Sequence, residues 1–120
     1  MKLLLVDDEL DFVSTLAERL EIRGIDVDWA VEPEAAMEKA QSDCYDIAVL
    51  DVKMPRVSGI DLKKMIQEKC PDTQYIFLTG HGGEESFREA TQETGEQCYL
   101  LKPIPFEHLL AKIQELQGNR

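Results

Sequence analysis

The sequence lacks any apolar stretch long enough to cross a membrane. Its N-terminal apolar run, Leu3–Val6, is closed at once by the acidic run Asp7–Glu9, so it is too short for a signal peptide. Internal repeats, linkers and low-complexity segments are also missing from the 120 residues. We therefore expect one soluble, cytoplasmic domain over residues 1–120, with no membrane partner.

Cysteine and basic residues are both scarce. The three cysteines, Cys44, Cys70 and Cys98, share no C-x-x-C spacing, which argues against a disulfide framework or a zinc site and suits a reducing compartment. Only 13 lysines and arginines stand against 24 acidic residues, and a net charge of -11 repels nucleic acid. The acidic excess favours solubility, or an affinity for cations or a basic partner surface.

Five segments have the pattern of strands. Ile47–Leu50 is apolar throughout and stops at Asp51, as expected for a strand that is buried on both faces. Ile25–Ala30 alternates apolar with acidic residues, which indicates an edge strand with one face in water. The five expected strands are Leu3–Val6, Ile25–Ala30, Ile47–Asp51, Tyr75–Leu78 and Cys98–Leu101.

Helical segments alternate with these strands. Gly24 ends the first helix, Pro33 opens the second, Ser58 caps the third, and Pro105 begins a strongly amphipathic last helix. The fourth, Glu84–Glu93, has few apolar positions and is expected to be the most weakly packed. This alternation predicts an α/β, doubly wound parallel sheet with right-handed crossovers and helices on both faces.

Polar residues stand at the strand ends. Asp7 and Asp8 follow the first strand, Asp51 ends the third, and Thr79 and Lys102 follow the fourth and fifth. In a parallel sheet these ends meet around one crevice. Three carboxylates held close repel one another by roughly 4 kcal/mol per pair, and a hard cation such as Mg²⁺ relieves that repulsion. Asp51 is then a candidate nucleophile for an aspartyl phosphate.

Five motifs occur in order along the whole chain. They are V-D-D-E at Val6–Glu9, V-L-D-V-K-M-P at Val49–Pro55, S-G at Ser58–Gly59, L-T-G at Leu78–Gly80 and Y-L-L-K-P at Tyr99–Pro103. Together they resemble the receiver domain of the two-component response-regulator family, of the chemotaxis and phosphorelay type. The resemblance implies the flavodoxin-like receiver fold, with five helices around a five-stranded sheet of order 2-1-3-4-5.

The resemblance also implies a phosphoryl-acceptor site. Asp51 would accept the phosphoryl group from a histidine kinase or a phosphotransfer protein, in a Mg²⁺-dependent reaction. Asp8 would bind Mg²⁺ directly and Asp7 through water, while Asp51 and the backbone carbonyl of Lys53 would complete the protein ligands. Such a domain catalyses only its own phosphotransfer and autodephosphorylation, so we do not expect an enzyme.

Further residues match the switching part of the family. Thr79 and Lys102 would bind the phosphoryl oxygens, Tyr99 matches a rotating aromatic switch, and the bond from Lys102 to Pro103 would be cis. Phosphorylation would switch a face made of the helix Glu84–Glu93, the fifth strand and the last helix. That face would act on a downstream output domain or protein target, and it is a candidate homodimer face. Direct contact with nucleic acid is not expected.

Plainer roles stay open for the same residues. Asp7 and Asp8 could cap the first helix, Thr79 could be an ordinary strand-end residue, and Lys102 could lie on the surface. Tyr99 could pack in the core without switching.

Other functions also stay open. A Mg²⁺-dependent aspartyl-phosphate phosphatase of the haloacid-dehalogenase kind places an acid two residues after its nucleophile, where this chain has Lys53. A flavodoxin-like electron carrier needs a phosphate-binding loop after the first strand, where Asp7–Glu9 would repel the flavin phosphate. A non-catalytic interaction module is the third alternative.

Overall fold

The computed structural model of the chain describes residues 1–80 and 98–118, and the helix expected at Glu84–Glu93 lies outside these residues. The described elements are β1 (Lys2–Val6), α1 (Leu10–Ile22), β2 (Asp26–Ala30), α2 (Pro33–Ser42), β3 (Ile47–Asp51), α3 (Gly59–Lys69), β4 (Gln74–Thr79), β5 (Tyr99–Leu101) and α5 (Phe106–Gly118). Among the described helices, none has both the length and the apolar character for a membrane crossing.

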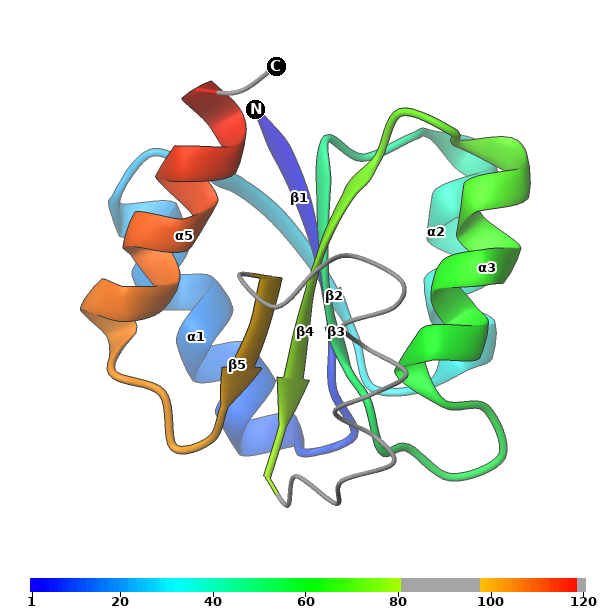
Figure 1. The fold of residues 1–120 in the computed structure, drawn as a ribbon, viewed down its shortest axis with the longest axis horizontal. Coiled ribbons are helices and arrows are strands. Elements are labelled where there is room, and N and C mark those ends of the chain that lie inside the picture. The colour runs from blue at the N-terminus through cyan, green and yellow to red at the C-terminus, as the bar shows by residue number, and fades with distance from the viewer. Residues whose placement is uncertain (81–97, 119–120) are drawn as a thin grey trace.

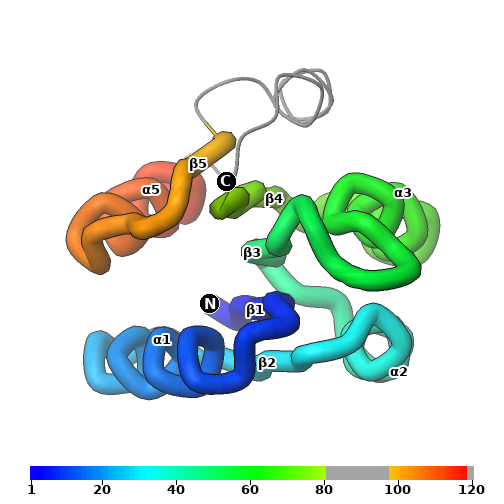
Figure 2. Tube along the Cα trace, turned by 90° about the horizontal axis from the view of Figure 1, so that it is seen from below, coloured from blue at the N-terminus to red at the C-terminus, as the bar shows by residue number. Residues whose placement is uncertain are grey.

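The strands form one parallel sheet of order β2-β1-β3-β4-β5, which confirms the predicted strand order. Figure 1 shows α1 and α5 on one face of this sheet and α2 and α3 on the other. Figure 2 looks along the strands, and the five of them run as a column between the two pairs of helices. The predicted doubly wound architecture is therefore confirmed for the described residues.

Alternation along the strands divides the core into two parts. Leu3 and Leu5 of β1 pack in the cluster that includes α1 and α5, whereas Leu4 and Val6 pack in the cluster that includes α2 and α3. The five residues of β3 are all buried, as its unbroken apolar sequence predicted. Because both faces are covered, the central strands hold the residues at their ends in fixed positions.

The edge position of β2 is confirmed, but its alternation of buried and exposed residues is less regular than predicted. Val27 packs in the cluster that includes α1 and Ala30 in the cluster that includes α2, so the strand buries one residue on each face, while Asp26 is exposed. Trp29 lies in the apolar half of the alternation, yet 36% of it is exposed because the strand is at the edge of the sheet. Asp28 is half-buried and accepts a hydrogen bond from the hydroxyl of Tyr45 at 2.7 Å.

The cysteine prediction was wrong for two of the three residues. Cys44 and Cys70 form a disulfide, with their Cα atoms 5.6 Å apart, while Cys98 is free and buried. Cys44 follows α2 and Cys70 directly follows α3, and both helices end beside the amino ends of the strands. The two cysteines are 26 residues apart in the sequence, and this spacing does not predict that they are close in space. Only the crossover topology brings the two helix ends together.

The start of α3 is packed tightly against the end of β3. Ser58 caps the helix as predicted, since its Oγ accepts from the backbone N–H of Asp61 at 3.1 Å. The N–H of Gly59 donates to the carbonyl of Val52 at 3.0 Å. A Cβ at residue 59 would collide with the backbone carbonyl of Asp51, so only glycine fits this close approach.

We therefore expect Gly59→Ala to lower the free energy of unfolding by about 1–3 kcal/mol, because the added methyl group must displace the backbone of β3 or α3. Urea unfolding followed by circular dichroism measures the change. Gly118→Ala is the matched control, since a Cβ there meets no atom within 4 Å. Equal stabilities for the two variants would contradict the tight packing.

Candidate functional site

Four of the predicted site residues stand at carboxyl ends of strands, on one edge of the sheet. Asp7 follows β1, Asp51 ends β3, Thr79 ends β4 and Lys102 follows β5. Backbone hydrogen bonds continue past the strand ends, from the N–H of Asp7 to the carbonyl of Ala30 at 3.2 Å and from the N–H of Lys102 to that of Thr79 at 2.7 Å. These bonds hold the site residues on the rigid sheet and not on free loops.

Three carboxylates gather at this edge. One oxygen each of Asp7, Asp8 and Asp51 lies within 4.8 Å of the others. Asp7 is fully buried and Asp51 is 4% exposed, whereas Asp8 is open to solvent. The N–H of Glu9 donates to Asp7 Oδ1 at 2.9 Å, and the N–H of Lys53 donates to Asp51 Oδ1 at 3.3 Å. Each buried carboxylate therefore has one oxygen fixed by its own loop.

Lys102 supplies the positive charge in this cluster. Its Nζ lies 2.5 Å from Asp7 Oδ2, 3.2 Å from Glu9 Oε1 and 3.8 Å from Asp51 Oδ2. The ammonium group also lies 4.6 Å from the centre of the Phe12 ring. Burial lowers the pKa of Lys102, but the hydrogen bond to Asp7 and the charge of Asp51 outweigh it, so the pKa is raised overall.

One ammonium group does not offset the burial of the carboxylates. Burial raises the pKa of Asp51 to about 7, the charge of Asp7 adds to this rise, and Lys102 opposes it. Burial also raises the pKa of Asp7, despite its hydrogen bond to Lys102. Additional positive charge would therefore stabilise the ionised carboxylates of this pocket, which is the electrostatic condition for binding a cation.

Thr79 and Tyr99 lie together beside this cluster. Thr79 is fully buried and Tyr99, on the neighbouring β5, is 7% exposed. Burial raises the pKa of the Tyr99 hydroxyl, and a hydrogen bond with the Thr79 side chain offsets part of the rise. The low exposure of Tyr99 shows that its aromatic ring is turned into the protein.

The structure brings the predicted residues together. Asp7, Asp8, Asp51 and Lys102 form one cluster, with Thr79 on the adjacent strand end, and the bond from Lys102 to Pro103 is cis as predicted. The contacts of Lys102 with Glu9 and Phe12 were not anticipated. Glu9 stands inside the V-D-D-E motif, which could have suggested it, whereas nothing in the sequence singles out Phe12.

Residues 3–114 match the family model described as the response regulator receiver domain. The chain belongs to the response regulator receiver domain family. Transcriptional regulatory protein CpxR of Escherichia coli (strain K12) is 37% identical over 115 residues, which are 96% of this chain and 48% of CpxR. The chain spans about half the length of the curated relatives it matches.

Solved receiver structures have the same fold. A response regulator receiver domain protein from Clostridium thermocellum is 30% identical, has a TM-score of 0.89, and the match covers 98% of this chain and 94% of that one. A response regulator from Burkholderia pseudomallei is 28% identical with a TM-score of 0.83, covering 98% and 71%. That structure contains a phosphorylated aspartic acid and a calcium ion.

The raised pKa of Asp51 gives a pH-dependent stability. Between the usual value of 3.8 and about 7, the folded protein binds the proton more tightly than the unfolded chain, so stability falls as pH rises through this window. In EDTA, Asp51→Asn should raise the free energy of unfolding at pH 8 by roughly 1–2 kcal/mol, with solvent screening reducing the full effect. The gain should be smaller at pH 5.

Urea unfolding at the two pH values measures this difference. Asp72→Asn is the control, because it removes an exposed aspartate away from the cluster and should change stability little at either pH. A gain for Asp51→Asn that is the same at pH 5 and pH 8 would contradict a titrating, destabilising carboxylate.

Proposed function

We propose that Asp51 accepts a phosphoryl group from a histidine kinase or a phosphotransfer protein. The observation that carries this proposal is the position of its buried carboxylate at the end of the central strand, beside the carboxylates of Asp7 and Asp8 and near the ammonium of Lys102. One carboxylate oxygen accepts from the N–H of Lys53, and the other faces Lys102. The second oxygen is the candidate nucleophile.

The reaction is a phosphoryl transfer between two side chains. A carboxylate oxygen of Asp51 attacks phosphorus, the bond from phosphorus to the donor imidazole nitrogen breaks, and that nitrogen keeps the electron pair. Thr79 ends the neighbouring strand β4 and Lys102 follows β5, and from there both would bind the phosphoryl oxygens. Their positive charge and hydrogen bond stabilise the charge of the acyl phosphate on Asp51.

The acidic cluster suits Mg²⁺. Receiver domains generally bind this ion at an acidic pocket, and hard carboxylate oxygens are the donors it prefers. The raised pKa values of Asp7 and Asp51 fit such a site, since burial disfavours their charged forms and a bound cation would favour them. We propose that Asp8 binds the ion directly, Asp7 through water, and that Asp51 and the carbonyl of Lys53 complete the protein ligands. A bound cation supplies charge neutralisation during phosphoryl transfer.

The domain serves signalling, and we propose that it catalyses only its own phosphotransfer and autodephosphorylation. Named relatives such as CpxR are transcriptional regulatory proteins, which supports an output domain or a protein target that responds to the phosphorylated form. We propose a cytoplasmic location, and residues 1–120 as one receiver unit. The switching and candidate homodimer face would consist of β5, α5 and the expected helix Glu84–Glu93.

Incubation with a small acyl phosphate and Mg²⁺ should add one phosphoryl group to the protein, measured by intact mass. The label should be alkali-labile and map to Asp51, because an aspartyl phosphate is an acyl phosphate. EDTA should prevent labelling, since the carboxylate cluster would repel the anionic donor without a cation.

Asp51→Asn should not be labelled, and Asp61→Asn, an exposed aspartate in the first turn of α3, is the matched control that should be labelled as the wild type is. Labelling of Asp51→Asn at another residue would refute the assignment. Sustained release of phosphate over many turnovers would favour the phosphatase alternative.

Phosphorylation should also disturb Tyr99, because a shift of Thr79 toward a phosphoryl oxygen on Asp51 would change the space beside the neighbouring strand β5, which carries Tyr99. Amide NMR with beryllofluoride as the phosphoryl mimic should show large shifts from Thr79 to about Leu110. The shifts should shrink in Thr79→Ala while Mg²⁺ still binds. Shifts confined to the loops around Asp7, Asp51 and Lys102 would argue against a switch.

A further inference from the structure

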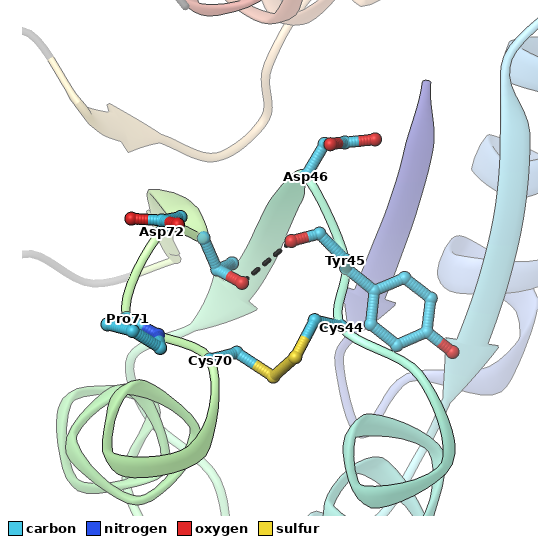
Figure 3. Close-up of a pocket in the computed structure, with 7 residues that line it drawn as sticks. Cys44, Tyr45, Asp46, Cys70, Pro71 and Asp72 are labelled. Atoms are coloured by element: carbon cyan, nitrogen blue, oxygen red, sulfur yellow. Dashed lines mark hydrogen bonds between the residues drawn. A yellow bond between two sulfur atoms is a disulfide. The ribbon is translucent and has the colours of Figure 1, made fainter.

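The disulfide between Cys44 and Cys70, drawn in Figure 3, lies near the amino ends of β3 and β4, whereas the acidic cluster lies at the carboxyl ends of the strands. Cys44 belongs to the connection between α2 and β3, and Cys70 is the residue that ends α3. Neither residue is used by the phosphoryl-acceptor site. We propose that this bond is a reversible thiol–disulfide site, which exchanges with a dithiol reductant.

The two cysteines differ in their exposure to solvent. Cys44 is exposed, whereas Cys70 is 2% exposed. A hollow of about 240 Å³ opens beside the bond and is lined by both cysteines, together with Pro71 and Asp72. Figure 3 shows the bond bridging the ends of the two helix connections next to this hollow. An incoming thiolate therefore reaches the sulfur of Cys44, and Cys70 is the leaving group.

The exchange proceeds in two steps. A thiolate of the reductant attacks Cys44 Sγ, the protein S–S bond breaks, and Cys70 Sγ takes the electron pair and then a proton. The second thiolate of the reductant then attacks the reductant's first sulfur, which is bonded to Cys44 in the mixed disulfide. This attack releases Cys44, which also takes a proton. The protein gains two electrons and two protons, and the dithiol is oxidised to a disulfide.

The surroundings also fit the reduced form. The carbonyl oxygen of Ala40 lies 3.8 Å from Cys70 Sγ, and that of Lys69 lies 4.0 Å from Cys44 Sγ. In the disulfide neither sulfur carries a proton, so these contacts cannot be hydrogen bonds there. After reduction each thiol has a carbonyl acceptor already within reach of a sulfur hydrogen bond. The backbone does not need to rearrange to satisfy the new thiols.

Other contacts hold the same connections together. Thr73 Oγ1 donates to the carbonyl of Tyr45 at 2.7 Å, the bond drawn in Figure 3, and Lys69 Nζ donates to the carbonyl of Gln41 at 2.7 Å. The N–H of Gln74 donates to the carbonyl of Asp46 at 2.9 Å. Breaking the disulfide therefore leaves the α2–β3 connection tied to the region after α3, and the reduced protein should stay folded.

The disulfide restricts the conformations that are open to the unfolded chain. It closes a loop with a sequence separation of 26 residues that contains all of β3, Asp51 and α3. A closed loop of this length restricts the unfolded chain, so the oxidised form should be the more stable one. The redox state would thus set how readily the segment that contains Asp51 unfolds.

The test uses Cys98→Ala, which removes the third thiol and leaves the pair intact. The air-oxidised protein is incubated without denaturant with dithiothreitol, or with a thioredoxin-class protein, and free thiols are then alkylated and counted by intact mass. We expect no alkylation before reduction and two alkyl groups after it, with the circular dichroism spectrum unchanged. The Tm should fall on the order of 10 °C and recover on reoxidation.

Two results would overturn the proposal: free thiols at Cys44 and Cys70 in the air-oxidised protein, or a bond that is reduced only in denaturant. The direction of attack is tested with a thioredoxin-class protein that lacks its second cysteine and so traps the mixed disulfide. Peptide mass spectrometry should locate the adduct on Cys44, and an adduct on Cys70 would refute the polarity. Cys44→Ser is the matched control, whose Tm should equal that of the reduced protein and should not respond to reductant.

Discussion

The crowding of carboxylates around Lys102 is the constraint on which the rest of the site depends. Parallel strand order places the ends of β1 and β3 side by side, so Asp7 and Asp51 cannot avoid each other. Like charges in a buried setting destabilise the fold, and the two-sided core around β3 supplies the stability that offsets this cost. Lys102 reaches both carboxylates from the far strand β5 and yet does not bring the pKa of Asp51 back to its usual value. These buried carboxylates, which Lys102 neutralises only in part, lower the stability of the metal-free protein and at the same time favour the binding of a cation.

The β3–α3 segment connects this edge of the sheet with the opposite one. At the carboxyl edge of the sheet, the start of α3 at Gly59 packs against the carbonyl of Asp51, so a movement of the loop after Asp51 would also shift the start of α3. At the other end of the helix, Cys70 is bonded to Cys44, which lies three residues before β3 begins at Ile47. Strand β3 and helix α3 therefore form one covalently closed unit in the oxidised protein. Close packing transmits small displacements along such a unit, because neither end can relax independently.

The sequence was enough to predict the features that depend on the local pattern of residues and on the direction of the strands. The apolar run up to Asp51 identified the central strand, and the polar residues at the strand ends identified the site, because a parallel sheet gathers its carboxyl ends at one edge. Features that depend on side-chain reach were missed, such as the packing of Lys102 over Phe12. The pairing of Cys44 with Cys70 was missed because spacing along the chain does not show which connections meet at the amino edge of the sheet. Trp29 was misjudged because alternation identifies a face but not whether any helix covers it.

Thr79 stands between the site and the aromatic side chain of Tyr99. Thr79 is fully buried at the end of β4, and Tyr99 is almost fully buried on the neighbouring β5. In the proposed phosphorylated state the Thr79 hydroxyl would donate to a phosphoryl oxygen on Asp51. A shift of Thr79 toward that oxygen would change the space beside Tyr99. A change from a mostly inactive to a mostly active population needs roughly 3–5 kcal/mol of preference. New charge-assisted hydrogen bonds from Thr79 and Lys102 to the phosphoryl group have the strength to supply this preference.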